Sequence, residues 1–304
     1  MAVESLTNPR ENLPNVYTDI TVREIDFVSR FGRNIQALMD ILGIIRPIKK
    51  ENGTRLVSYV TDVTLASGTV DPGCVIPYSK YSITESMLGD VTVEKFAKAV
   101  PIEDVKTYGA DVAIQKSDDA FLTKLQNLIT GRFYDHLLDD TSALTETYAT
   151  WQMAVSMAIG LVKDKFQEIE RDVSEVVVFA NTLDAYAYLG GAGITTQTLQ
   201  GLEYVKNFLG ARTLILSHKI PRNKVVAVPV ENIDLYHVDP ADSDYAKLGL
   251  VYTTDGDTNF IGFHAQGNYS TAVGETYALL GMTLWNEIAD GVAICTVSAN
   301  PSQD

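Results

Sequence analysis

The side chains that most often do chemistry in proteins are scattered in this sequence. There are four histidines, His136, His218, His237 and His264. They are far apart, and neither a His-Glu-x-x-His motif nor the cysteine spacing of a zinc site is present. Cys74 carries no signature of a nucleophile, Cys295 lies in an unrelated context, and there is no Gly-x-Ser-x-Gly elbow. We therefore expect no catalytic, cofactor-binding or metal-binding residues, and no enzyme.

Three short motifs resemble binding sites only superficially. Residues 190–193 (GGAG) look like a phosphate loop, but they follow a predicted helix and lack the later glycine, so a flexible loop is favoured. Asp239, Asp242 and Asp244 could coordinate calcium, but the twelve-residue calcium-loop pattern is absent, so a solvated turn is favoured. The third motif resembles a metal cluster, although a hydrated helix face is the simpler interpretation. It consists of Asp135, His136, Asp139 and Asp140.

The charge of the chain restricts its partners. The 304 residues include 24 basic and 39 acidic ones, which gives a net charge of −15 and argues against tight wrapping of nucleic acid. Residues 206–224 nevertheless contain five basic residues and no acidic one: Lys206, Arg212, Lys219, Arg222 and Lys224. Phe208 is the only aromatic residue there, whereas a nucleic-acid site would need several. Pairing with an acidic surface of a neighbouring subunit is therefore the favoured interpretation, and nucleic-acid binding is the alternative.

Composition indicates a globular protein without a membrane span. The hydrophobic content of 46% is ordinary, so a core within one large domain or two intertwined domains is expected. No apolar run is long enough to cross a bilayer, and the first 15 residues lack the basic start and apolar segment of a secretory signal. Two cysteines without metal-ligand spacing favour a reduced, intracellular setting.

The N-terminal half predicts an arm, a helix and a long hairpin. Residues 1–20 contain prolines and no periodicity, so they are predicted to form an extended arm. Thr21 and Glu24 have capping-box spacing at the start of a helix that Gly43 and Pro47 close. Residues 55–84, rich in Val, Thr and Tyr, predict a hairpin with little to bury by itself, so it is expected to rest on another surface, such as another copy of the chain.

The remaining elements alternate between helices and strands. Ser117, Asp118 and Asp119 are predicted to cap a long helix that runs to about Asp139. Two apolar runs flank a basic turn at residues 221–224 and are predicted to form a β-hairpin or two neighbouring strands. Further helices are predicted at 148–171, 185–189 and 202–209, and strands at 94–100, 104–108, 176–179, 213–216, 225–228, 248–253, 260–265, 271–285 and 292–297.

The order of these elements resembles that of the major capsid protein of tailed bacteriophages, the Hong Kong ninety-seven-type shell fold. The text FAKAVPIEDV at 96–105, with KSDD and the helix ending in RFYDH at 132–136, is similar to that family's stretch between extended loop and spine helix. VVVFA followed by NTLD at 176–184 resembles its axial-domain strand and helix, and the strand, Ile-Pro turn and second strand at 213–228 resemble the text that follows. The resemblance covers essentially the whole chain.

The resemblance implies an α+β fold with five parts. Residues 1–20 would be the N-terminal arm, and 21–51 the first helix and its connection. Residues 52–84 would be the extended loop. Residues 85–144 and 248–304 would form the peripheral domain, with the spine helix at 117–139, and 145–247 the axial domain.

It also implies a coat protein that assembles through hexamers and pentamers into an icosahedral shell around double-stranded DNA, in a virion assembled in the host cytoplasm. The partners would be other copies of the chain, with separate scaffolding, portal and decoration proteins, and neither a cofactor nor a membrane. An encapsulin-type nanocompartment shell and an α/β enzyme with a scattered site are the alternatives. Some relatives form a lysine–asparagine bond between subunits. Lys80 with Asn268 or Asn286 could be compared with that pair, but their spacing does not predict it.

Overall fold

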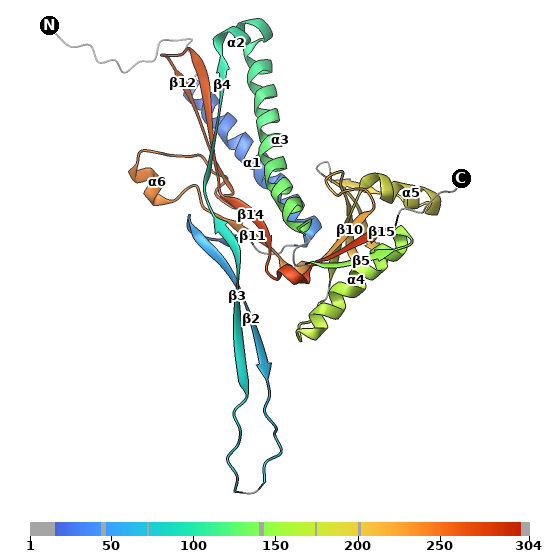
Figure 1. Cartoon of the computed structure of the whole chain (residues 1–304). Coiled ribbons are helices and arrows are strands. Elements are labelled where there is room, and N and C mark those ends of the chain that lie inside the picture. The colour runs from blue at the N-terminus through green and yellow to red at the C-terminus, as the bar shows by residue number, and fades with distance from the viewer. Residues whose placement is uncertain are drawn as a thin grey trace, which may run out of the picture.

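A computed structural model describes residues 16–43, 47–71, 73–139, 143–173, 175–199 and 202–298. Within these residues the chain is a mixed α+β protein with six α-helices and four sheets. A broad body carries the helices and three of the sheets, and one long two-stranded hairpin projects from it (Figure 1). The end that carries α2 lies opposite the free end of the hairpin.

The upper part of the body packs two long helices against an antiparallel sheet. Helix α1 (Val16–Leu42) lies beside α3 (Ala110–Leu137), and the short α2 (Ile102–Tyr108) precedes α3 (Figure 1). The sheet has the order β12–β13–β4, with bounds Ile261–Asn268, Val273–Leu280 and Glu94–Pro101. Phe27 of α1 stacks on Phe263 of β12 with ring centroids 4.0 Å apart, and both rings are buried. This contact fixes α1 on the sheet.

A seven-stranded sheet forms the second part of the body. Its order is β5–β15–β10–β6–β9–β8–β7. Helices α4 (Trp151–Glu168) and α5 (Thr182–Ala192) cover one face, and the residues of the other face belong to the core that also contains α1 and α3. Because both faces are covered, β6 is buried at every position and reads as the continuous apolar run VVVFA. The strand bounds are Leu144–Tyr148, Val176–Ala180, Gln197–Leu199, Leu202–Phe208, Ala211–Leu216, Lys224–Pro229 and Ala293–Val297 for β5 to β10 and β15.

The remaining elements join these parts. A small sheet of order β1–β11–β14 connects them, with bounds Ile48–Lys49, Ile233–His237 and Met282–Asn286. The hairpin consists of β2 (Thr54–Thr64) and β3 (Lys80–Val91). Helix α6 (Ser243–Lys247) and two 3-10 turns, Val230–Asn232 and Ala289–Gly291, lie in connections.

Two predicted helix starts are wrong because the supposed caps lie inside longer helices. Helix α1 begins at Val16, so part of the predicted arm is helical, and residues 1–15 of the arm lie outside the described residues. The Glu24 carboxylate accepts hydrogen bonds from the Ala265 amide and the Thr253 hydroxyl, both at 2.6 Å, instead of capping a helix. Helix α3 begins at Ala110, directly after Gly109, and the Ser117 hydroxyl donates to the Ile114 carbonyl within it.

Two predicted assignments between helix and strand are also wrong. Residues 104–108 belong to α2, which starts after Pro101 and carries acidic residues in its first turn, an arrangement that suits a helix start. Residues 202–208 form strand β8, which pairs antiparallel with β9 across a turn at Leu209 and Gly210. The predicted glycine loop is mostly helix, because α5 runs to Ala192 and ends at Gly193 in the left-handed conformation (φ 67°).

The strands of the C-terminal half also pair differently from the prediction. Strands β9 and β10 are present, but β6 lies between them, so they form neither a hairpin nor a neighbouring pair. The predicted run at 271–285 is divided at Gly281 into β13 and β14, which belong to different sheets. A Cβ at Gly281 would lie 2.8 Å from the Val238 Cβ, so only glycine permits this close approach. Within residues 248–253, only Thr253 pairs, through a single bridge to Phe263.

Candidate assembly surface

The root of the hairpin is anchored in the body. Leu56 and Val91 are buried in a small apolar cluster with Tyr236 and Val238 of the neighbouring sheet. Between Leu56 and Val57 the pairing shifts, because Leu56 pairs with Gly89 and Val57 with Met87. This β-bulge bends the hairpin where it leaves the body.

Gly89 allows the hairpin to pass close to the body. Its φ is 149°, and a Cβ built there would lie 3.0 Å from the Trp285 ring. The Trp285 ring also packs edge-on against His136 of α3, with centroids 4.7 Å apart, so it is held in place in the body. A side chain at position 89 would push the hairpin away from this ring, so the glycine sets the direction in which the hairpin leaves.

Beyond the bulge, one face of the hairpin carries large apolar side chains that stay exposed within the residues that the structure describes. Paired residues of antiparallel strands share a face, and Val63 pairs with Tyr81 and Thr61 with Ile83. The large apolar residues of this face are 54–74% exposed: Tyr59, Val63, Tyr81, Ile83 and Met87. The residues that alternate with them on the strands include Asp62, Thr64, Lys80, Ser82 and Thr84, which are polar or charged.

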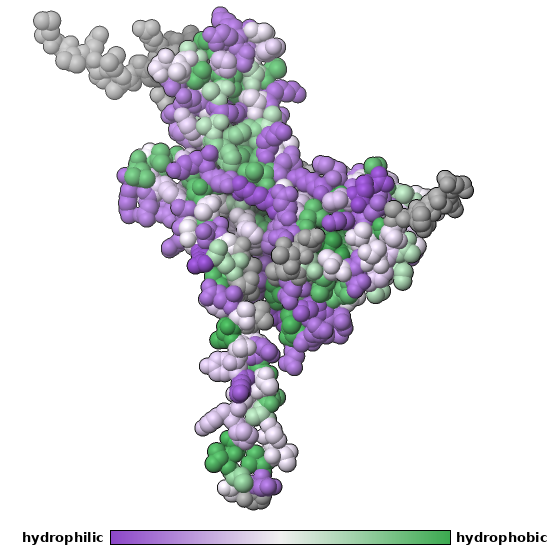
Figure 2. Space-filling model, viewed as in Figure 1, coloured by the Kyte–Doolittle hydropathy of each residue, from purple (hydrophilic) through white to green (hydrophobic). Residues whose placement is uncertain are grey.

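The free end of the hairpin continues this apolar surface. Leu65 is 80% exposed, and Val75, Ile76 and Tyr78 are 89%, 74% and 94% exposed. Figure 2 shows hydrophobic side chains gathered at this end, far from the body. Exposed apolar surfaces of this kind are typical of sites that contact another molecule.

The body that carries the hairpin is held together by a buried ionic cluster. Asp118 accepts from Arg23 Nε at 2.6 Å and Arg23 Nη2 at 2.8 Å, and its Oδ1 lies 2.5 Å from Lys98 Nζ. The cluster therefore joins α1, α3 and β4. Burial alone would raise the pKa of Asp118, but the hydrogen bonds and charges of Arg23 and Lys98 outweigh it and lower that pKa below its ordinary value. The sequence pattern predicts Asp118 at a helix start, and no local signal indicates its role in this cluster.

The structure does not bring the four histidines together into one site. His136 packs on Trp285, and burial lowers the pKa of its imidazole. His237 packs edge-on against Phe260, with centroids 5.1 Å apart. His264 is on β12, where its Nδ1 lies 3.6 Å from Glu24, and His218 is exposed after β9. Within the described residues, no group of three or more His, Cys, Asp or Glu side chains is arranged to hold a metal ion.

The aspartate motifs organise turns and surfaces. The Asp239 carboxylate lies 2.6 Å from Lys49 Nζ and accepts from the Ala241 amide, while Asp242 caps α6 through the Asp244 amide. These contacts fit the favoured interpretation of a turn. In the other cluster Asp135 is exposed on α3, Asp139 is exposed just after that helix ends, and Asp140 lies outside the described residues.

Both cysteines are free thiols in different surroundings. Cys74 is exposed near the free end of the hairpin, and Cys295 is buried in β15 of the seven-stranded sheet. Burial, with a smaller effect of the Glu146 charge, raises the pKa of Cys295 to about 12. Burial therefore keeps the Cys295 thiol protonated near neutral pH.

The basic stretch does not form a single patch. Arg212 pairs with Glu175, and Arg222 with the buried Asp184, within the same chain. Lys219 Nζ donates to the Asn127 carbonyl and the Thr130 hydroxyl of α3. The two ends of the stretch are also apart, because Lys206 is on β8 and Lys224 is on β10, with β6 and β9 between these strands. Three of the five basic residues, Arg212, Lys219 and Arg222, therefore make contacts inside the subunit, and pairing of this stretch with a neighbouring subunit stays a prediction.

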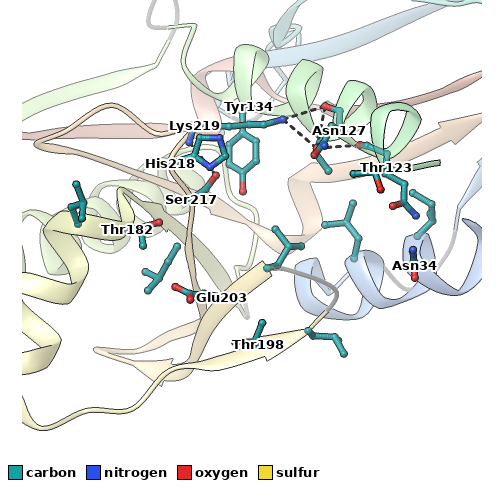
Figure 3. A pocket seen from close by; sticks show the side chains of 18 residues that line it. Asn34, Thr123, Asn127, Tyr134, Thr182, Thr198, Glu203, Ser217, His218 and Lys219 are labelled. Carbon is teal, nitrogen blue, oxygen red and sulfur yellow. Dashed lines mark hydrogen bonds between the residues drawn. The ribbon is translucent and has the colours of Figure 1, made fainter. Parts of the chain in front are cut away.

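A groove of about 700 Å³ lies between α1, α3 and the seven-stranded sheet. Figure 3 shows its polar side chains spread along the walls, with Lys219 bonded to α3 and Glu203 and Thr198 on the far side. Burial raises the pKa of Tyr134, which lines the groove, to about 12. The labelled polar groups do not converge on one point as a nucleophile and its base would.

Comparison with known proteins decides the fold. No protein-family model and no curated protein sequence matches the chain. Its structure is similar to the capsid of cyanophage A-1(L), at 13% identity and a TM-score of 0.56, over 86% of this chain and 93% of that one. The chain has the major capsid protein fold. The mature capsid of bacteriophage PhiM1 is also similar, at 9% identity and a TM-score of 0.50, over 84% and 85% of the two chains.

The same fold also occurs in a shell protein of another kind. The holo-SrpI encapsulin of Synechococcus elongatus PCC 7942 is similar at 13% identity and a TM-score of 0.50, over 100% of this chain and 99% of that one. These neighbours are structural shell proteins. In the part of the chain that the structure describes, no helix has both the length and the apolar character of a membrane span.

Proposed function

We propose that the chain is the coat subunit of a tailed phage, forming hexamers and pentamers of an icosahedral shell that encloses double-stranded DNA. The exposed apolar face of the hairpin carries this proposal. An isolated strand pair of this length with so many exposed apolar residues is not stable in water by itself. The major capsid protein fold supports it. A repeated shell contact would cover the hairpin with a neighbouring copy in every subunit.

The proposal assigns roles to the parts of the chain. The hairpin β2–β3 would be the intersubunit loop, extending to Val91 instead of ending at residue 84. Helix α3 would be the spine of a peripheral domain built on β4, β12 and β13. Residues 145–247 would form the axial domain. Strand β15, expected in the peripheral domain, pairs with β10 and β5, so it would complete the axial sheet instead.

The charge of the chain fits a container for DNA. With a net charge of −15, a wall made of these subunits would repel the genome rather than bind it tightly. Packing and release would then meet little resistance from the shell. We propose no catalytic role, a location in the virion after assembly in the host cytoplasm, and separate scaffolding, portal and decoration proteins as further partners.

An encapsulin-type compartment is the second candidate, since the encapsulin neighbour covers the entire chain. The genes beside this one separate the two functions: portal and terminase genes would accompany a phage coat, and a gene for an enzyme cargo would accompany an encapsulin.

Sedimentation velocity and negative-stain electron microscopy of the purified full chain test the shared part of both functions. We expect hexamers, pentamers or closed shells. A compact monomer under all assembly conditions would refute the proposal.

A further inference from the structure

Each arm of the hairpin root is supported by a contact with a histidine of the body. The chain enters the hairpin from β1, which pairs with β11, and the Lys50 amide donates to the His237 carbonyl at 2.8 Å. The other arm passes over Trp285 at Gly89, and the Trp285 ring packs against His136 of α3. Figure 1 shows β11 and β14, the strands of His237 and Trp285, where the hairpin leaves the body.

The apolar support of the root is small. Leu56 and Val91 share a cluster with Tyr236 and Val238, and β1 contains only two residues. Neither of the two large cores includes a residue of β2 or β3 that the structure describes. A segment packed in this way can open locally while the rest of the protein stays folded. The contacts made by the two histidines therefore influence whether the root is closed.

The closed root suits neutral histidines. His237 is 7% exposed. Its Nδ1 and the Nε2 of His136 are buried, and neither atom has a hydrogen-bond partner in the part of the chain that the structure describes. Both nitrogens of a protonated imidazole are donors, so protonation would bury an unpaired donor and a positive charge at each ring. Opening the root would let water solvate both.

The groups around His237 do not compensate for its burial. Burial lowers the pKa of His237, whereas the Asp239 charge raises it, the Lys49 charge lowers it and a hydrogen bond with the Ile48 backbone raises it. Lys49 Nζ lies 2.6 Å from the Asp239 carboxylate, so the acid and the base offset each other. Phe260 presents an uncharged ring to the imidazole. The pKa of His237 is therefore lower than its ordinary value.

The surroundings of His136 have the same effect. Burial lowers the pKa of His136 more than the Asp139 charge raises it. Arg132, one turn earlier on α3, pairs with Glu94 of β4. On the side of β14, the neighbour of the ring is the uncharged Trp285. Both histidines therefore stay neutral in the closed root to a lower pH than they would in water.

We propose that the hairpin root is an acid-sensitive joint, which is closed while His136 and His237 are neutral and opens when they are protonated. The closed root carries no penalty above the ordinary histidine pKa of about 6.5. The penalty grows as the pH falls from that value towards the lower pKa of the closed state, because the open root binds more protons. The joint belongs to the subunit itself, so it goes beyond the proposed function and applies to either kind of shell.

Hydrogen exchange of the full-length protein at pH 7.5 and 5.5, corrected for the intrinsic effect of pH on exchange, tests the joint. The reporters are the Lys50, Gly53 and Val93 amides, which donate to the His237 carbonyl, the Val91 carbonyl and the Asn52 side chain. We expect their protection to fall by about tenfold for each histidine, or about a hundredfold in all, at pH 5.5. The amides of β6 should stay protected.

Two substitutions remove the titrating groups and keep the packing. His136→Phe retains an aromatic ring against Trp285, and His237→Gln retains a donor for the Ile48 backbone. Each should remove about tenfold of the acid response, and the double variant should remove nearly all of it. His218→Gln is the matched control, because His218 is exposed after β9, and it should leave the response unchanged.

The fluorescence of Trp285 supplies an independent readout in a Trp151→Phe background, because a protonated imidazole quenches a neighbouring indole. The emission should fall with a midpoint below about pH 6.5, and His136→Phe should abolish this titration. A root that keeps its protection at pH 5.5, or a double variant with the wild-type acid response, would overturn the joint. Electron microscopy tests assembly separately: a chain that stays monomeric but shows the acid response would refute the shell function and leave the joint intact.

Discussion

The hairpin and the seven-stranded sheet contain similar apolar residues, but the sheet buries them and the hairpin leaves them exposed. Val178 of β6 is fully buried, whereas Val63 of β2 is 54% exposed. The sheet is covered by α4 and α5 on one face and by the core around α1 and α3 on the other. The hairpin has a polar face and an apolar face, and the large apolar side chains of the latter stay exposed among the described residues. Strand chemistry alone therefore does not tell whether a strand completes its own subunit or another one.

Removing residues 66–74 from the hairpin should give the largest difference between assembly and subunit stability. We expect complete loss of shells, because the shorter hairpin withdraws its exposed apolar residues Val75, Ile76 and Tyr78 from the neighbouring copy in every subunit at once. The subunit should keep its fold, since loop length has a small effect on stability. Circular dichroism and electron microscopy on the same variant measure both properties.

Removal of the buried ionic partner at Asp118 should have the next largest effect. Asp118→Asn leaves Arg23 and Lys98 without a carboxylate and should lower the free energy of unfolding by about 3 kcal/mol. Asp164→Asn on the exposed face of α4 is the control and should change little. Urea unfolding at pH 7 measures both variants.

The free energy of unfolding of the wild-type protein should also depend on pH through Asp118. The pKa of Asp118 is lower in the folded state than in the unfolded chain, so the folded state binds fewer protons. Its stabilising contribution is complete above the unfolded pKa of about 4 and is lost as the pH falls through the lower folded pKa. The urea midpoint of the wild type should therefore decrease more steeply than that of Asp118→Asn over this acidic range. Equal slopes would contradict this role.

A matched pair of substitutions sharpens the comparison directly. Val178→Ala removes two methyl groups from a filled core and should lower the free energy of unfolding by about 2 kcal/mol. Val63→Ala makes the same change on the exposed hairpin and should alter the unassembled subunit by less than about 0.5 kcal/mol. Particle yield should respond to Val63→Ala more than subunit stability does. Equal destabilisation in urea would show that the hairpin belongs to the subunit's own core.

Substitutions of the cysteines should give the smallest effects. Here too the exposed hairpin position, Cys74, should tolerate change better than the buried sheet position, Cys295. Cys74→Ser should leave stability and assembly unchanged, whereas Cys295→Ser buries a hydroxyl and should cost about 1–2 kcal/mol. A thiol reagent at pH 8 should modify Cys74 rapidly and Cys295 only after unfolding, since burial raises the pKa of Cys295 to about 12. Assembly that required an oxidised cysteine would contradict both expectations.

The sequence by itself determined the elements whose signals are local. The apolar run of β6, the paired β-rich arms of the hairpin and the Gly43 end of the first helix all follow from residue type and spacing. The order of these elements also carried the resemblance to phage coat proteins, which the structure confirms at the level of the fold. The exposed hairpin was predictable because its residues could not bury themselves.

Only the tertiary structure decided how distant elements meet. An aspartate can cap a helix or take part in a buried ionic cluster, so the sequence predicts a cap at Asp118, whereas the structure places Arg23 and Lys98 beside it. The local sequence of β8 predicts a helix. The segment is a strand because its pairing with β9 fixes its conformation more strongly than its own propensity does. The place of β6 between β9 and β10 depends on contacts between segments far apart in the chain, which no local pattern records.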